Sequence, residues 1–156
     1  MGCSSMILQK RDDVSLNKAI KDIRFVMEHT DLKLMFINEK DISQTEKINS
    51  IALNVANKFD GSDDEQQLVI TVFNQGEDDD IEEFDFICKG KGLICSLYID
   101  DLSGCEEVLL DFLYEYMKIN PDVVLWNDGF EWVYTYSDII NAKNKEFDKL
   151  WCYKKP

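Results

Sequence analysis

The acidic residues of this 156-residue chain are concentrated in one segment, and that segment limits what the chain can fold into. Between Asp60 and Asp85 the sequence contains eleven Asp and Glu residues and neither Lys nor Arg, while the whole chain has a net charge of −14. Repulsion among these carboxylates opposes compaction, and a protein that keeps such a field often uses it to attract a cationic partner. We therefore predict a partner-binding surface formed by Asp60, Asp63, Asp64, Glu65, Glu77, Asp78, Asp79, Asp80, Glu82, Glu83 and Asp85.

An apolar run divides this acidic segment into two parts. Leu68 to Phe73 is apolar at every position but Thr71 and rich in β-branched residues, which is typical of a strand inside a sheet. Six residues of strand span about 20 Å, so the acids before and after the run are expected to form two patches. The chain is then expected to turn back and carry Glu82, Glu83 and Asp85 along a hairpin toward the first patch.

Composition favours a folded domain despite the charge. Hydrophobic residues make up 45% of the chain and aromatic residues 12%, more than disordered chains contain. The length suits a single domain, so we expect one domain over residues 1–156, with residues 1–12 flexible. No run reaches the roughly 20 apolar residues that span a bilayer, and no signal-peptide pattern begins the chain. The expected location is therefore the cytoplasm, without a membrane partner.

Periodicity and capping signals predict three main helices. Ser15 is a plausible cap for a first helix with Leu16 on its buried face, and Ser43 opens a second helix in a capping box with Glu46. A third helix is predicted from the capping box at Ser103 to Asn120, and a short fourth one is capped by Ser137. The expected core face of the second helix contains Ile48, Ile51, Ala52, Val55 and Phe59.

The remaining apolar runs predict an antiparallel sheet. Leu32 to Ile37 suits one strand, and a meander of about three strands is expected from Leu68 to Phe73, Phe84 to Cys88 and Leu93 to Ile99. Asp128-Gly129 between apolar runs predicts a C-terminal hairpin. The predicted fold class is therefore α+β, with this sheet packed against the helices.

Two tryptophans of the predicted hairpin have two interpretations. Trp126 and Trp132 either pack on the long helix as ordinary core or form an apolar anchor in a partner interface, where Trp is enriched. In the second interpretation the acids steer the encounter and the aromatic rings bind.

Several classes of function are disfavoured by the residues present. His29 is the single histidine and lies at a predicted helix end, and the nucleophile, P-loop and dinucleotide motifs are missing from the sequence. No enzyme activity and no cofactor are expected. The five cysteines lack paired spacing and are expected to be reduced, and the acidic runs do not match a calcium loop, so no metal site is predicted. Nucleic acid is disfavoured because its phosphates would be repelled.

The chain resembles the small acidic immunity proteins of bacterial polymorphic toxin systems. The likeness rests on size and charge, and on the stretch from Glu106-Glu107-Val108-Leu109-Leu110 through Trp126-Asn127-Asp128-Gly129-Phe130-Glu131-Trp132 to Trp151-Cys152-Tyr153. It implies a non-catalytic inhibitor whose acids cover the nucleic-acid groove of a basic toxin, such as a nuclease. The alternative is an acidic adaptor or regulatory interaction module, and the sequence leaves the oligomeric state open.

Overall fold

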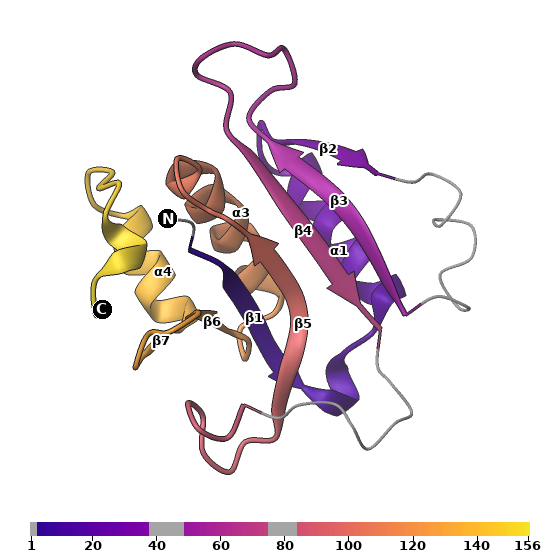
Figure 1. Ribbon diagram of the computed structural model, residues 1–156, viewed down its shortest axis with the longest axis vertical. Helices are drawn as coiled ribbons and strands as arrows, with labels where there is room; N and C mark the ends of the chain where they lie inside the picture. Colours follow the sequence, from indigo (N-terminus) through magenta and orange to yellow (C-terminus); the bar gives the residue numbers. More distant parts are fainter. Residues whose placement is uncertain (1–2, 38–48, 75–83) are drawn as a thin grey trace.

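The computed structural model describes residues 3–37, 49–74 and 84–156, and its centre is one antiparallel sheet of seven strands (Figure 1). The order across the sheet is β2-β3-β4-β5-β1-β6-β7. The strands are β1 Ser5–Lys10, β2 Lys33–Phe36, β3 Ser50–Ala56, β4 Gln67–Phe73, β5 Leu93–Asp100, β6 Val124–Asn127 and β7 Val133–Tyr134. The helices are α1 Leu16–Glu28, α3 Glu106–Ile119 and α4 Tyr136–Lys143, with short 3-10 turns at Arg11–Asp13 and Trp151–Tyr153. The α+β class is confirmed, but the sheet has more strands than predicted.

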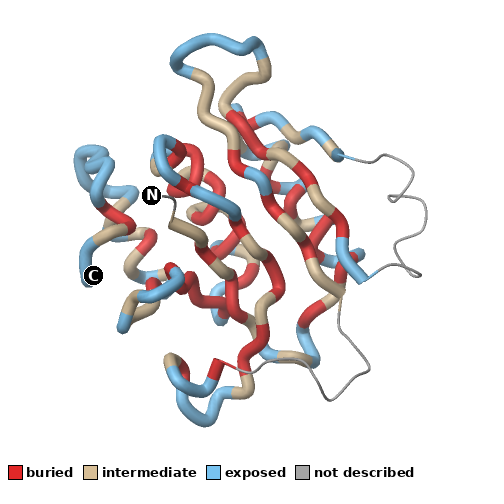
Figure 2. Tube along the Cα trace, in the orientation of Figure 1, coloured by how far each residue is buried: buried red, intermediate tan, exposed pale blue. Residues whose placement is uncertain are grey.

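The helices lie on one face of the sheet and enclose the main core. Figure 1 shows α1 and α3 behind the strands, and α4 packs against α3 and β7. Apolar side chains that point to this face, such as Ile7, Ile70 and Leu97, have no exposed surface. The apolar α3 is central to this core, because seven of its residues are buried. Figure 2 shows the resulting buried positions along the central strands and inner helices.

The first helix and its flanking strand follow the sequence signals. The Ser15 hydroxyl accepts a hydrogen bond from the Lys18 amide, which confirms the predicted cap of α1. His29 occupies the other end of this helix, where its Nδ1 atom lies 2.9 Å from the Phe25 carbonyl oxygen and its ring stacks on Phe25. The strand predicted over Leu32 to Ile37 is β2.

Two predicted elements are wrong. The helix predicted from Ser43 is wrong over its described part, because residues 50–56 form β3, paired with β2 and β4. Ser43, Glu46 and Ile48 lie outside the described residues. The strand predicted over Phe84 to Cys88 is also wrong, because this segment turns back on itself, with the Ile87 and Cys88 amides both donating to the Phe84 carbonyl.

Both later caps are displaced from the predicted residues. The third helix begins at Glu106, after Cys105, so Ser103 does not cap it. The Glu106 carboxylate instead accepts from the Gly104 amide at 3.1 Å. The short α4 is capped by Thr135, which forms a capping box with Asp138, and not by Ser137.

The segment expected to be flexible at the beginning of the chain contains an interior strand. Ser5–Lys10 pairs with β5 on one side and β6 on the other, so the backbone of β1 is bonded along both edges. Ile7 and Leu8 are fully buried on opposite faces of the sheet. The apolar run Met6-Ile7-Leu8 explains this, since a strand in a sheet interior buries both of its faces.

Candidate functional site

The described part of the acidic segment begins in the loop that joins β3 to β4, which projects from one end of the sheet (Figure 1). Residues 57–66 contain four acids and a single base, Lys58. Lys58 Nζ lies 2.5 Å from Asp64 Oδ1 and 3.8 Å from Asp60 Oδ2, so one ammonium group forms ion pairs with two carboxylates. The loop therefore keeps an excess of negative charge at its surface.

Hydrogen bonds within the loop fix the position of its carboxylates. The Ser62 hydroxyl lies 2.5 Å from Asp60 Oδ1 and 2.7 Å from Asp64 Oδ1, and the Gly61 amide donates to Glu65 Oε2 at 2.6 Å. Gly61 has φ of +72°, a left-handed conformation that suits glycine at this tight turn. The loop thus presents three of its four acids in a set geometry, which reduces the entropy lost when a partner binds.

The electrostatics of the loop favour ionised acids. The pKa of Asp64 is lowered to about 2, mainly by the hydrogen bond from Lys58 and then by that from Ser62. The pKa of Asp60 is also lowered, chiefly by the hydrogen bonds from the side chain and backbone of Ser62. Both carboxylates are solvent-exposed and therefore charged at neutral pH.

An acidic cleft continues from the base of this loop. The cleft has a volume of about 430 Å³ and is bordered by Asn57 and Gln66 of the loop. The Asn57 side chain ties the two ends of the loop together, since its Oδ1 accepts from the Gln66 amide at 2.8 Å. Gln66 also contacts α3, where its Oε1 accepts from the Val108 amide at 3.4 Å.

Carboxylates outside the predicted segment line this cleft. Glu107, Asp111 and Glu115 follow one another at four-residue spacing along α3, and Asp31 faces them from the segment after α1. Asp111 pairs with Lys143 of α4, and Glu115 lies 3.0 Å from Lys118. Asp31 and Glu107 form no ion pair with a described base. The acidic loop and the cleft together form a surface that sequence reasoning identified only in part.

A sequence signal for the cleft existed. Glu107, Asp111, Glu115 and Lys118 are the narrow polar strip of an otherwise apolar helix, and such a strip marks its solvent side. Its position next to the acidic loop depends on long-range packing of α3 against the end of β4, which no local pattern specifies.

The structure separates the predicted site residues. Asp85 lies beside Phe84, whose amide donates to the Leu93 carbonyl at the start of β5. Because β5 begins at the end of the sheet opposite the 57–66 loop, the prediction that Asp85 returns to the first patch is wrong (Figure 1). Glu77, Asp78, Asp79, Asp80, Glu82 and Glu83 lie outside the described residues.

The two predicted tryptophans occupy different environments. Trp126 is 6% exposed, and its Nε1 donates to the Phe130 carbonyl at 2.8 Å. It packs against Phe84 and Phe86 with ring centroids 5.6 and 5.3 Å away. Trp132 is half-buried and packs against Phe130 and the main core. Trp126 thus belongs to a second apolar cluster, which it forms with Leu8, Phe84, Cys88, Leu93 and Val124. A role of either ring in partner binding stays a prediction.

Reactive or metal-binding clusters are not evident in the described ranges. All five cysteines are free thiols, and burial raises the pKa of Cys95 and Cys152 to about 12. Residues 3–37, 49–74 and 84–156 contain no group of three or more His, Cys, Asp or Glu side chains placed to hold a metal. None of their helices has the length and apolarity needed to traverse a bilayer. Comparisons with protein-family models, curated proteins and solved structures found no significant match.

Proposed function

We propose that this protein is a non-catalytic, cytoplasmic immunity protein or inhibitor that binds and neutralises a basic toxin such as a nuclease. The observation that carries the proposal is the exposed 57–66 loop, in which four acids face a single lysine and contacts within the loop hold three of their carboxylates in place. A surface with excess negative charge accelerates association with a cationic protein and repels nucleic acid. The same surface would occupy the groove in which such a toxin binds its phosphates.

The acidic cleft beside α3 supports a macromolecular partner more than a small ion. The cleft and the loop share Asn57 and Gln66, so their carboxylates form one extended surface. Screening acts over about 8 Å at physiological salt, so well-separated carboxylates act jointly on a broad basic surface and almost independently on a single ion. The protein therefore suits a partner with several Lys and Arg residues in one region.

The test combines capture with inhibition. The immobilised protein is exposed to an extract of its own cells, bound proteins are eluted with rising salt, and each is assayed for nuclease or other toxic activity with and without this protein. We expect a basic protein that elutes steeply with salt and loses its activity at one equivalent. Several unrelated bound proteins without inhibited activity would favour the alternative, an acidic adaptor.

A charge-matched pair of variants assigns the surface. One variant converts the four loop acids to amides, and the control converts four exposed acids elsewhere. The loop set is Asp60, Asp63, Asp64 and Glu65, and the control set is Asp12, Asp13, Asp122 and Glu131. We expect slower association at low salt for the loop variant than for the control. Equal slowing would show that net charge alone, and not this loop, attracts the partner.

A further inference from the structure

The sheet face opposite the helices is unusually free of charge. The pairing register places Ala52, Thr71, Tyr98, Met6, Trp126 and Val133 in one row across six strands on this face. An antiparallel sheet with one open face normally alternates apolar residues inward with polar residues outward. Charged residues of the described strands occur on this face only at strand ends, at Lys10, Lys33 and Asp100. We call this surface the open face.

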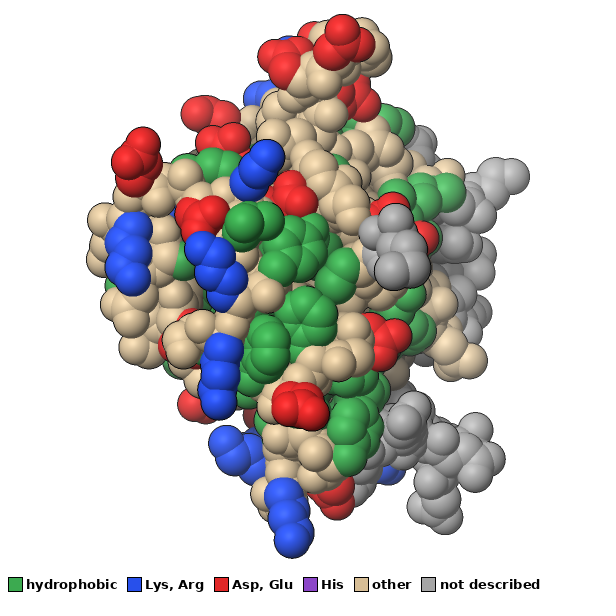
Figure 3. All heavy atoms as spheres, turned by 60° about the vertical axis from the view of Figure 1, so that its left-hand side comes forward, with side chains coloured by type: hydrophobic (Ala, Val, Ile, Leu, Met, Phe, Trp, Pro, Cys, Tyr) green, Lys and Arg blue, Asp and Glu red, His purple; other side chains and the backbone are tan. Residues whose placement is uncertain are grey.

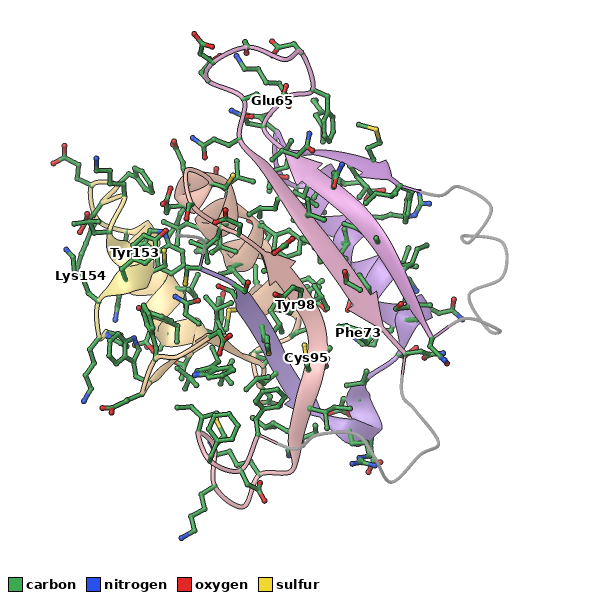
Figure 4. All side chains as sticks on the ribbon, in the orientation of Figure 1. Glu65, Phe73, Cys95, Tyr98, Tyr153 and Lys154 are labelled. Atoms are coloured by element: carbon green, nitrogen blue, oxygen red, sulfur yellow. The ribbon has the colours of Figure 1, made fainter. Side chains whose placement is uncertain are left out.

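The open face contains an apolar cavity. It has a volume of about 310 Å³, and its walls include Met6 of β1, Phe73 of β4, Cys95 and Tyr98 of β5, and Phe84. Figure 4 shows Phe73, Cys95 and Tyr98 near the middle of the molecule, away from Glu65 at the end of the 57–66 loop. This volume falls at the lower end of the range for ligand pockets and holds one large side chain.

Exposed apolar residues extend the surface around the cavity. Phe86 is 64% exposed although its ring stacks edge-on against Trp126, and Val69 is 37% exposed on β4. Figure 3 shows hydrophobic side chains gathered in the middle of the face it displays, with Lys and Arg along its left and lower margins. A contiguous apolar patch inside a polar rim is typical of a protein interface.

The net charge of the chain indicates which kind of partner binds this surface. A second copy of the chain would bring another −14 against the same charge, which opposes face-to-face pairing. A cationic protein is attracted by the net field and meets no unpaired charge at the uncharged row, so no buried charge has to be desolvated there. The complementary partner combines basic residues with a large apolar side chain.

We propose that the open face is the apolar contact of the cationic partner, with the cavity receiving a large apolar side chain of that partner. This inference rests on the proposed function, since it assigns a contact site to the same basic partner. The acids then set the rate of encounter, and the cavity sets the lifetime of the complex.

Two synthetic peptides of equal charge test the proposal. One is acetyl-Lys-Lys-Phe-Lys-Lys-amide, and the other has Gly in place of Phe. Each is titrated at low salt into the full chain labelled with ¹⁵N, and amide shifts are followed. We expect both peptides to shift the amides of residues 60–65. We expect the Phe peptide alone to shift Thr71, Cys95 and Tyr98, and to bind about tenfold more tightly, because it buries an aromatic ring.

The outcomes separate the two proposals. Equal affinities, with shifts confined to residues 60–65, would overturn the open-face assignment and leave the acidic surface in place. Absence of binding by both peptides would overturn the open-face assignment and remove the electrostatic basis of the proposed function as well. Light scattering that shows a dimer, dissociated by Tyr98→Glu, would assign the open face to a second copy and overturn the proposal.

A pair of variants strengthens the test, because electrostatic attraction and apolar contact predict opposite changes in affinity for the Phe peptide. Thr71→Glu adds negative charge to the open face, and Asn141→Glu adds the same charge at an exposed position of α4. By attraction alone both variants would bind the Phe peptide more tightly. We expect Thr71→Glu to bind it about tenfold more weakly and Asn141→Glu to bind it at least as well as the parent chain. Thermal melting checks that both variants remain folded, and tighter binding by a folded Thr71→Glu variant would contradict the proposal.

Discussion

The two faces of the sheet carry similar residues but differ in how far those residues are buried. On β4, Ile70 points toward the helices and has no exposed surface, whereas the adjacent Val69 points to the open face and is 37% exposed. Both are β-branched, and the strand is apolar on both sides. The difference teaches that apolar character alone does not identify the core, because a face becomes core only when another layer covers it.

A matched pair of truncations on β4 is the strongest test of this difference between the two faces. Ile70→Ala leaves a cavity between the strand and the helices, so we expect a loss of about 4 kcal/mol in the free energy of unfolding. Val69→Ala removes a half-exposed side chain, and we expect a loss below about 1 kcal/mol. Urea denaturation measures both, and equal losses would show that the open face is as well packed as the helical one.

The second apolar cluster gives an intermediate case on the open face. Phe84 is 5% exposed and packs against Trp126, so Phe84→Ala should cost about 3 kcal/mol, at the low end for buried aromatic truncations. Phe86→Ala should cost below about 0.5 kcal/mol, because its ring is mostly exposed. The same denaturation experiment applies. A large loss for Phe86→Ala would mean that residues 84–92 cover more of the open face than its exposure indicates.

A smaller effect is expected in the helical layer, at the cap of α4. Thr135 accepts from the Asp138 amide at 3.4 Å, and the Asp138 carboxylate accepts from the Thr135 amide at 2.8 Å. Thr135→Ala should lower stability by about 1 kcal/mol. Ser137→Ala is the control and should have little effect, since Ser137 is not the cap. If thermal melting showed a loss for Ser137→Ala and none for Thr135→Ala, the cap of α4 would be Ser137, as the sequence pattern predicted.

The smallest effect concerns the pH dependence of the acidic loop. The folded pKa of Asp64, about 2, lies below the usual aspartate value of 3.8, so any stability from its contacts is complete above pH 3.8 and disappears as the pH falls through 2. Lys58→Met removes the largest cause and should raise this pKa toward 3.8. Titration of the Asp64 carboxyl by NMR measures the shift, and an unchanged pKa would mean that Ser62 alone stabilises the charged form.

Local signals predicted the elements that depend on local energetics. The cap at Ser15, the apolar spacing of α1, the strand at Leu68 to Phe73 and the hairpin at Asp128-Gly129 each involve neighbours in sequence. The acidic loop was predicted as a charged surface for the same reason, since its charge is a property of composition. These elements needed no information about distant contacts.

One of the wrong elements is a segment that two periodicities fit. Ile51, Ala52 and Val55 match helical spacing, but Ile51, Leu53 and Val55 also alternate as in a strand. Pairing with β2 and β4 decides between them, and those partners lie elsewhere in the sequence. Phe84 and Phe86 alternate too, yet the chain turns there and places the two rings around Trp126.

The candidate site was predictable in charge and not in arrangement. The acids of α3 were visible as its polar strip, but their meeting with the 57–66 loop requires the contact between Gln66 and Val108. The open face could not be found from alternation, because alternation separates two faces without saying which one the helices will cover.

The interior position of β1 has a consequence for how the protein is made. This strand is the earliest of the seven in the sequence, yet its neighbours β5 and β6 begin at Leu93 and Val124. At a synthesis rate of about 5–20 residues per second, the ribosome delivers the nearer neighbour several seconds later. Until then the apolar segment Met6-Ile7-Leu8 is available to chaperones, and the sheet closes only when the second half of the chain has emerged.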